Sequence, residues 1–422
     1  LAEHLVRWRV CVDIWLACHT EPPSNREIKM KKILYSAAAA VAFCGVAGAD
    51  GHQTKIGVLL GFTGPIESLT PPMASGAEMA MAEVNAGGGF VGGEVVPMRA
   101  DSTCVDSAAA TAAAERLVAD GVVAIMGADC SGVTGAVLQN VARANGVVMI
   151  SPSATSAALT TAEDDGLFFR TSPSDLRQGQ VLAGMLAERG VTEVAVTYVN
   201  TDYGIGLADN FALSFGGTIT ASVPHEASKP DYSAEVADLA AAGGEVLAVL
   251  GYLDQGGNGI IKDALDSGAF DTFLLGDGMI GAALPAEIGS DLDMSYGTAP
   301  GAVGEGVALF EEAFAAAGFE GEGPYRGESY DAAALLMLAM QAGGSADRAT
   351  VAANVLNVAN APGEPINVGE LSKAMAILAS GGEVDYVGAT NVELIGPGEA
   401  AGTYLEYSYS DGEMINEGVS SH

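Results

Sequence analysis

Short apolar runs alternate with alanine-rich stretches through most of this 422-residue chain. Unbroken apolar runs of this kind are typical of strands that are buried on both faces of a parallel sheet. Strand–helix alternation gives right-handed crossovers and predicts doubly wound α/β units. In the first such unit the expected strands are Lys55–Phe62, Glu94–Asp101, Val122–Ala128 and Val147–Ser153, and the expected helices are Pro72–Asn85, Ser107–Ala119 and Gly132–Ala144.

The same alternation starts again after the segment Phe168–Asp175, whose Ser-Pro step favours an extended chain crossing. Two α/β units are expected, because a chain of this length exceeds one ordinary core. The second unit has expected strands at Glu193–Asn200, Thr218–His225, Glu245–Tyr252 and Thr272–Gly278, with helices from Gly206, near Ser233–Ala242 and up to Ser267. Further helices at Tyr330–Met340 and Val368–Ser380 and a strand at Gly402–Ser410 follow.

Residues 1–49 do not continue this pattern. Residues 30–49, MKKILYSAAAAVAFCGVAGA, combine two lysines, an apolar run and a final Ala-Gly-Ala, which is the composition of a secretory signal peptide. A single membrane anchor is the alternative, but the apolar run is shorter than the ~20 residues that span a bilayer. A lipid on Cys44 is a further alternative, against which stands the bulky Phe43. We expect residues 1–29 to be an upstream extension and the exported, periplasmic protein to begin near Asp50.

The charge balance excludes several classes of partner. The chain has 18 basic and 53 acidic side chains; residues 1–49 hold 6 and 4 of them, so residues 50–422 carry 12 and 49, a net charge of −37. Such a surface repels nucleic acid and anionic lipid. It suits a soluble protein in a salty exterior, where ions screen the self-repulsion.

Cysteine usage fits export. Residues 50–422 contain two cysteines, Cys104 and Cys130, and an even count in an oxidising compartment makes a disulfide the default. The closed loop would add about 3–4 kcal/mol in loop-entropy terms. A metal site would need further ligands and a thiolate nucleophile would need a base, yet the same residues hold only His52, His225 and His422. We therefore expect no metal, no cofactor and a His225 that lies on the surface at a strand end.

Ligands of open α/β sheets sit beyond the carboxyl ends of the strands, so the segments that follow the strands deserve most weight. These segments are rich in glycine, hydroxyl residues and aspartate. Ser131 either caps the helix that begins there or, with the free N–H groups of the helix start, binds a ligand carboxylate. The cluster at residues 151–156, which contains Ser153 and Thr155, is either a plain turn or a second set of hydroxyl donors.

Acidic and aromatic residues follow the strands of the second unit. Asp277 is either a turn residue or the partner of a ligand ammonium, and Tyr203 and Tyr252 either pack or present a ring face and hydroxyl. Two sequence motifs of enzymes are absent: the chain has no Gly-x-Ser-x-Gly turn and no phosphate-binding loop. In the glycine-rich stretch YGIGLAD, Asp209 replaces the third glycine of a dinucleotide loop.

Seven segments, in this order, resemble the periplasmic leucine/isoleucine/valine-binding proteins, the type I solute receptors of ABC importers: KIGVLLGFTGPIES, GAEMAMAEVNAGGGFVGGEV, ADSTCVDSAAATAAAERLVADGVVAIMGADCSG, ISPSATSAALT, LFFRTSPSDLRQGQ, DYGIGLADNF and GYLDQGG. The resemblance implies a non-catalytic, monomeric receptor that closes on an amino acid, branched-chain or otherwise aliphatic, and delivers it to a membrane permease. It implies two α/β lobes joined by three crossing strands, with lobe 1 at 50–171 plus 302–389 and lobe 2 at 172–301 plus 390–422.

The resemblance also assigns roles to single residues. It implies that Ser131 binds the ligand carboxylate, that Tyr203 closes from the second lobe, and that Asp277 binds the ammonium. It adds Ser153 and Ala154 through the backbone, Thr155 through its hydroxyl, Tyr252 and Leu69 to the ligand set, and it pairs Cys104 with Cys130 in a disulfide.

Three departures from the family pattern bear on the ligand. Asp277 stands where amino-acid binders often have Glu, Leu69 and Thr70 replace an aromatic–Gly pair, and Asp129 would add negative charge at the pocket mouth. An amide, urea or aromatic-acid ligand, or a sensor that reports to a signalling partner, is the alternative. A periplasmic hydrolase would need a nucleophile–base pair that the sequence does not supply.

Overall fold

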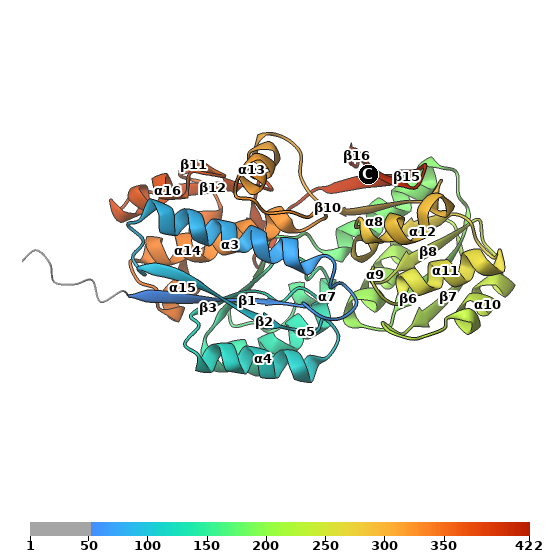
Figure 1. Cartoon of the computed structure of the whole chain (residues 1–422), viewed down its shortest axis with the longest axis horizontal. Helices are drawn as coiled ribbons and strands as arrows, with labels where there is room; N and C mark the ends of the chain where they lie inside the picture. Colours follow the sequence, from blue (N-terminus) through green and yellow to red (C-terminus); the bar gives the residue numbers. More distant parts are fainter. Residues whose placement is uncertain (1–51) are drawn as a thin grey trace, which may run out of the picture. The chain divides into compact units, whose positions relative to one another are not determined.

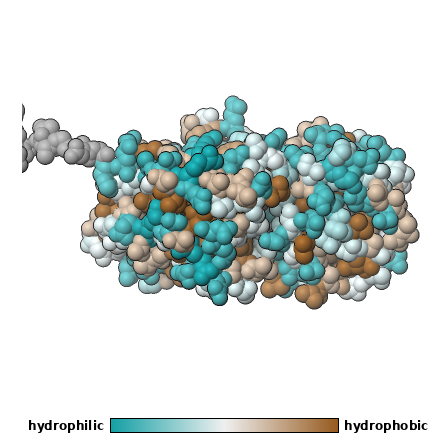
Figure 2. Space-filling model, turned by 90° about the horizontal axis from the view of Figure 1, so that it is seen from below, coloured by the Kyte–Doolittle hydropathy of each residue, from teal (hydrophilic) through white to brown (hydrophobic). Residues whose placement is uncertain are grey.

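Two seven-stranded sheets dominate the computed structural model, which describes residues 52–422 (Figure 1). The signal peptide and upstream extension predicted for residues 1–49 lie outside the described residues. Both sheets are mainly parallel and carry helices, so the predicted fold class, two doubly wound α/β lobes, is confirmed. On the face shown in Figure 2, hydrophilic and apolar residues are interspersed.

The first sheet has the strand order β13-β14-β5-β4-β3-β1-β2. Its parallel strands are β1 (Gln53–Leu60), β2 (Glu94–Asp101), β3 (Ala124–Gly127), β4 (Val148–Ser151) and β5 (Phe168–Arg170). The connecting helices are α3 (Thr70–Gly87), α4 (Ser107–Ala119), α5 (Ser131–Val137), which continues through a π-helical turn (Leu138–Ala142) into α6 (Arg143–Asn145), and α7 (Ala157–Thr160). Alanine favours the helix α4, and Asp106 caps it by accepting hydrogen bonds from Ala108 N and Ala109 N.

The second sheet repeats this plan with the order β16-β15-β10-β9-β8-β6-β7. Its parallel strands are β6 (Glu193–Val199), β7 (Thr218–His225), β8 (Val246–Leu250), β9 (Phe273–Leu275) and β10 (Tyr296–Pro300), and the antiparallel hairpin β15 (Tyr404–Ser410) and β16 (Glu413–Val419) extends it. The helices are α8 (Asp175–Glu188), α9 (Asp202–Ser214), α10 (Ser233–Ala242), α11 (Gly257–Ser267) and α12 (Ala283–Ile288).

The later helices return to the first lobe. These are α13 (Glu305–Ala316), α14 (Arg326–Gly343), α15 (Arg348–Ala359) and α16 (Leu371–Ala379), with the two-stranded sheet β11 (Glu364–Asn367) and β12 (Val384–Gly388). Helix α14 is almost fully buried and, from Ala332 to Met340, apolar on all sides, and it packs against α3, α15 and α16. A helix that is hydrophobic all round belongs in a core, and α14 is the centre of the first lobe.

The chain passes between the lobes at residues 171–174, 301–304 and 401–403, which separate elements of the two sheets. The last passage lies later than the sequence-based boundary at residue 390, because β13 (Leu394–Ile395) and β14 (Glu399–Ala400) join the first sheet, with Glu399 opposite Arg170. Strands of two residues leave no periodic pattern in a sequence, so the boundary could not be read from the apolar alternation.

Two further expectations need correction. The helix expected from Gly206 begins at Asp202, one residue before Tyr203. His225 is not a surface residue: it is 1% exposed, its Nδ1 lies 2.8 Å from Thr197 Oγ1, and burial lowers its pKa to about 4. Within residues 52–422, no helix combines the length and hydrophobicity that crossing a bilayer demands.

Candidate functional site

The carboxyl ends of the strands of both sheets meet around one pocket. In each sheet the second strand pairs on one side of the first strand and the later strands are added on its other side. This switch point lies between β1 and β3 in the first sheet and between β6 and β8 in the second. Open α/β sheets bind ligands at such switch points. The pocket is lined by residues that follow β1, β3, β4, β6, β8 and β9: Ile66, Leu69, Asp129, Cys130, Ser131, Ser153, Tyr203, Tyr252, Asp277 and Gly278, together with Met73 of α3 and Tyr325.

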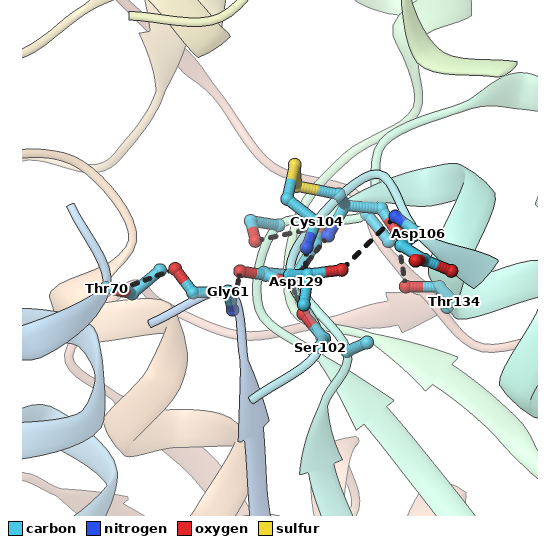
Figure 3. Close-up of a disulfide and its surroundings, with 12 residues drawn as sticks. Gly61, Thr70, Ser102, Cys104, Asp106, Asp129 and Thr134 are labelled. Atoms are coloured by element: carbon cyan, nitrogen blue, oxygen red, sulfur yellow. Dashed lines mark hydrogen bonds between the residues drawn. A yellow bond between two sulfur atoms is a disulfide. The ribbon is translucent and has the colours of Figure 1, made fainter. Parts of the chain in front are cut away.

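A disulfide and a buried carboxylate hold one wall of this pocket (Figure 3). The disulfide between Cys104 and Cys130 is present, which confirms that prediction and leaves no free thiol in residues 52–422. Asp129 accepts hydrogen bonds from Gly61 N (2.6 Å), Ser102 Oγ (2.8 Å) and Cys130 N (3.0 Å), groups that follow β1, β2 and β3.

Asp129 therefore does not act as a free negative charge at the pocket mouth. It is 1% exposed and both of its oxygens are engaged by these donors. Burial raises the pKa of Asp129, and the three hydrogen bonds oppose that rise. Its position indicates a brace that joins the ends of three strands.

Ser131 is the first residue of α5 rather than its cap. Cys130 occupies the cap position in extended conformation, and its sulfur, held in the disulfide, makes no capping hydrogen bond. Ser131 Oγ accepts a hydrogen bond from Ser156 N at 3.1 Å, which leaves its proton available to a ligand acceptor. The capping alternative for Ser131 is therefore wrong, because the cap residue precedes it.

Of the residues that follow β4, Ser153 lines the pocket and its neighbours do not. Ser153 lines the pocket, and its hydroxyl donates to Asp129 O at 3.1 Å. Ala154 does not line the pocket, since its N–H donates to Ser151 Oγ and its carbonyl accepts from Arg170. Thr155 Oγ1 is buried and has no hydrogen-bond partner in residues 52–422.

Asp277 is the centre of a buried hydrogen-bonded group to which residues of both lobes contribute. Tyr203 OH donates to Asp277 Oδ1 at 2.6 Å and accepts from Gly278 N at 3.1 Å, and Tyr325 OH donates to Oδ2. Burial raises the pKa of Asp277, against the lowering effect of the two tyrosine hydroxyls and Gly278 N–H. A carboxylate so placed can bind a ligand ammonium, with the tyrosine hydroxyls around it.

Two residues that act on Asp277, one by a hydrogen bond and one by its charge, were missed by the sequence reasoning. Tyr325 lies in the Gly/Pro-rich stretch between α13 and α14, far from any strand end, so the strand-end rule gives no indication of it. Asp175 is the first residue of α8, where an acidic residue is an ordinary helix feature. Only its position directly after the predicted crossing segment could have drawn attention to it.

Asp175 is the more informative of the two. It is fully buried, and neither of its carboxylate oxygens has a hydrogen-bond partner in the described part of the chain. Burial raises its pKa well above the usual value and the charge of Asp277 raises it further, while the Thr155 hydroxyl and the Arg170 guanidinium act in the opposite direction. Buried polar groups are nearly always satisfied, and the nearby Thr155 hydroxyl is the donor within reach of the Asp175 carboxylate. Neither residue lines the pocket.

The opposite wall of the pocket is apolar. Ile66, Leu69 and Met73 line it and are each at most 6% exposed, and the ring of Tyr252 stacks on that of Tyr203 with centroids 5.2 Å apart. The enclosed volume is about 30 Å³, room for roughly two water molecules. A larger ligand therefore enters only when the lobes separate.

Contacts between the lobes also form outside the pocket. Asp254, which follows β8, accepts a hydrogen bond from Ser68 N at 2.7 Å and donates its own N–H to Pro65 O at 2.9 Å. Ser156 Oγ donates to Asp202 O at 3.4 Å. In residues 52–422 no group of three His, Cys, Asp or Glu side chains is placed to hold a metal ion.

Two α/β lobes that enclose a small polar–apolar pocket at their switch points define a solute-binding protein of the clamshell type. Residues 53–366 match the family described as "Periplasmic binding protein". The chain belongs to this family, which consists of binding proteins rather than enzymes and supplies solutes to ABC transporters.

Individual relatives agree with this assignment. The chain is 29% identical over 370 residues to the chemotactic signal transduction system substrate-binding protein BasB of Halobacterium salinarum, covering 86% of this chain and 88% of BasB. It is 32% identical over 332 residues to Leu/Ile/Val-binding protein homolog 1 of Brucella melitensis biotype 1, covering 76% and 87%. The isoleucine complex of the branched-chain amino acid transporter protein LivJ from Streptococcus pneumoniae has the same fold, with a TM-score of 0.72, 22% identity and coverage of 87% and 98%.

Proposed function

We propose that this protein binds a branched-chain aliphatic α-amino acid between its lobes and delivers it to a membrane permease from the periplasm. The observation that supports the proposal is the buried carboxylate of Asp277 opposite an apolar wall, in a pocket whose lining includes no cationic side chain. A buried carboxylate without a cationic partner is unfavourable, so a ligand ammonium beside Asp277 would offset part of its desolvation penalty.

Each part of such a ligand has a matching group. The α-carboxylate is assigned to the Ser131 hydroxyl and the uncapped N–H groups at the start of α5, where the helix dipole favours an anion. The ammonium is assigned to Asp277, the carboxylate at the centre of the tyrosine hydroxyls in the pocket. The aliphatic side chain is assigned to the wall formed by Ile66, Leu69 and Met73, where each buried CH₂ group contributes about 0.8 kcal/mol.

Calorimetry with matched analogues tests the proposal. Leucine, isoleucine and valine should bind with dissociation constants below about 100 µM. Two analogues, 4-methylpentanoate, which lacks the ammonium, and 3-methylbutylamine, which lacks the carboxylate, should each bind at least about 100-fold more weakly, since each leaves one set of buried groups unpaired. Binding of benzoate, urea or an amide in place of every α-amino acid would refute the ligand class.

Point variants test which residue binds the ammonium and which binds the carboxylate of the ligand. Asp277→Asn removes the charge that the ammonium needs while keeping the size of the side chain, and Ser131→Ala removes the donor to the carboxylate. Both should lose leucine affinity, whereas the matched control Asp209→Asn, an exposed change on α9, should retain it. Unchanged affinity in Asp277→Asn would contradict the assignment of the ammonium.

A sensor role is the second candidate, and the similarity to BasB favours it. The sensor and the importer share the same ligand site and differ in the partner that reads lobe closure. Uptake of labelled leucine in cells that lack the protein distinguishes them. Lost uptake supports delivery to a permease, and intact uptake with lost chemotaxis towards leucine supports the sensor.

A further inference from the structure

A second cavity is lined by residues of α13, the start of α14 and the C-terminal hairpin β15–β16. We call it the hinge cavity; its volume is about 160 Å³, several times that of the pocket between the lobes. The first lobe contributes Val307 and Phe310 of α13, the second contributes Leu405 and Tyr407 of β15, and Gly301 of a chain crossing lies between them.

One carboxylate faces this cavity from a buried position. Glu328 lies in the first turn of α14, is 5% exposed and lines the hinge cavity. Among the side chains of residues 52–422 it has no ion-pair partner, because the neighbouring Arg326 guanidinium is bound by Glu311 of α13. The start of α14 supplies only backbone N–H groups to it.

The other groups around Glu328 do not compensate its charge. On the same helix, Asp331 accepts hydrogen bonds from Tyr386 OH, Thr390 and Ala389 N, and its negative charge disfavours a second one at Glu328. From β15, Tyr407 faces the carboxylate, and burial raises the pKa of this tyrosine to about 12, so that it stays neutral. β16 contributes only the neutral Asn416 to the lining.

The rest of the lining is mixed: Val307, Phe310 and Leu405 are apolar, whereas the Arg326–Glu311 ion pair, Thr390 and Asn416 are polar. The volume of the cavity is close to that of the ~150 Å³ engineered cavities that hold benzene. The chemistry thus combines one buried carboxylate that has no ion-pair partner with apolar surface for roughly four to six carbon atoms. We propose that the hinge cavity is a second binding site, for a small organic ammonium ion whose charge pairs with Glu328.

The position of the hinge cavity couples binding there to closure of the two lobes. Because its walls belong to both lobes and to a crossing segment, lobe motion changes the cavity, and by linkage a bound cation changes the lobe equilibrium. Burial, opposed by the helix N–H groups and reinforced by Asp331, raises the pKa of Glu328 to about 8. The neutral carboxyl attracts a cation weakly, so affinity should increase as pH rises through 8 and then level off, while an alkylammonium stays charged to about pH 10.

Butylammonium chloride is the probe, and the Asp277→Asn protein is the background, so that the pocket between the lobes does not capture the cation. Thermal unfolding and ligand-observed NMR should detect binding at millimolar concentrations, stronger at pH 9 than at pH 6. 1-Butanol and butyrate, which lack the positive charge, should bind at least tenfold more weakly. Adding Glu328→Gln should reduce butylammonium affinity at least tenfold.

A second variant tests the hinge cavity independently, in case Glu328→Gln impairs folding. Val307→Trp fills the cavity from a half-exposed position of α13 and leaves the carboxylate in place, and it should also abolish binding. Leu356→Trp on the exposed face of α15 is its matched control and should not. Binding that survives Glu328→Gln, binding that occurs only with Asp277 intact, or no binding up to about 20 mM would each overturn the proposal. None of these results depends on the ligand proposed for the pocket between the lobes.

Discussion

Replacing Asp129 by alanine removes a carboxylate that connects the ends of β1, β2 and β3 (Figure 3). Gly61 N and Ser102 Oγ, both buried, would lose their acceptor. An orphaned buried donor costs about 1–3 kcal/mol, so two of them cost about 2–6 kcal/mol. The alanine also relieves the desolvation of a buried carboxyl, whose raised pKa records that penalty, and we expect a net loss of about 2–4 kcal/mol in the free energy of unfolding.

Urea unfolding measures this loss as a shift of the midpoint at constant slope. Asp129→Asn is the matched control, because it keeps the side-chain size and one carbonyl acceptor and should lose only about 1 kcal/mol. Leucine affinity should fall in the alanine variant as well, since Cys130 and Ser131 follow the lost brace. A loss below about 1 kcal/mol in Asp129→Ala would refute the role of the carboxylate in holding the three strand ends.

Three other outcomes test separate parts of the site. The double variant Cys104→Ser/Cys130→Ser opens a bridge of sequence separation 26 and should lower unfolding free energy in urea by about 3–4 kcal/mol; no loss would contradict it. Asp254→Ala removes a bond to Ser68 N that joins the lobes and should weaken leucine binding about 3–10-fold with unchanged unfolding midpoint. We propose that Asp277 binds the ammonium as the anion, and its pKa is raised. Affinity measured by calorimetry should therefore fall on acidification, beginning above the ordinary aspartate range; pH-independent binding down to roughly pH 4 would contradict this.

The strand-end rule predicted much of the pocket from the sequence. Ser131, Ser153, Tyr203 and Asp277 come from four separate strands, yet parallel topology places their ends at one edge of each sheet, and the structure brings all four together. Apolar strands and glycine-rich turns are local features, so single segments reveal them. The roles of these residues towards a ligand remain predictions.

Residues that act through tertiary packing were not predictable in this way. Tyr325 reaches Asp277 from a loop of the first lobe, and its contribution exists only because the lobes meet. The burial of His225 and Asp175 depends on what covers the ends of β7 and α8, which no local pattern reports. The capping alternative for Ser131 could not be decided from the sequence, because the choice between cap and first helical residue depends on the backbone angles of Cys130.

The pocket and the surface both carry negative charge, but salt separates their effects. Residues 50–422 have a net charge of −37, which repels anionic solutes at a distance. At an ionic strength of about 1 M the screening length falls to ~3 Å, so this long-range repulsion disappears. Asp277 lies buried beside the proposed ammonium position, where salt screens little. The preference for leucine over 4-methylpentanoate should therefore persist in molar salt; if it vanished there, the selectivity would come from the surface charge and not from the buried carboxylate.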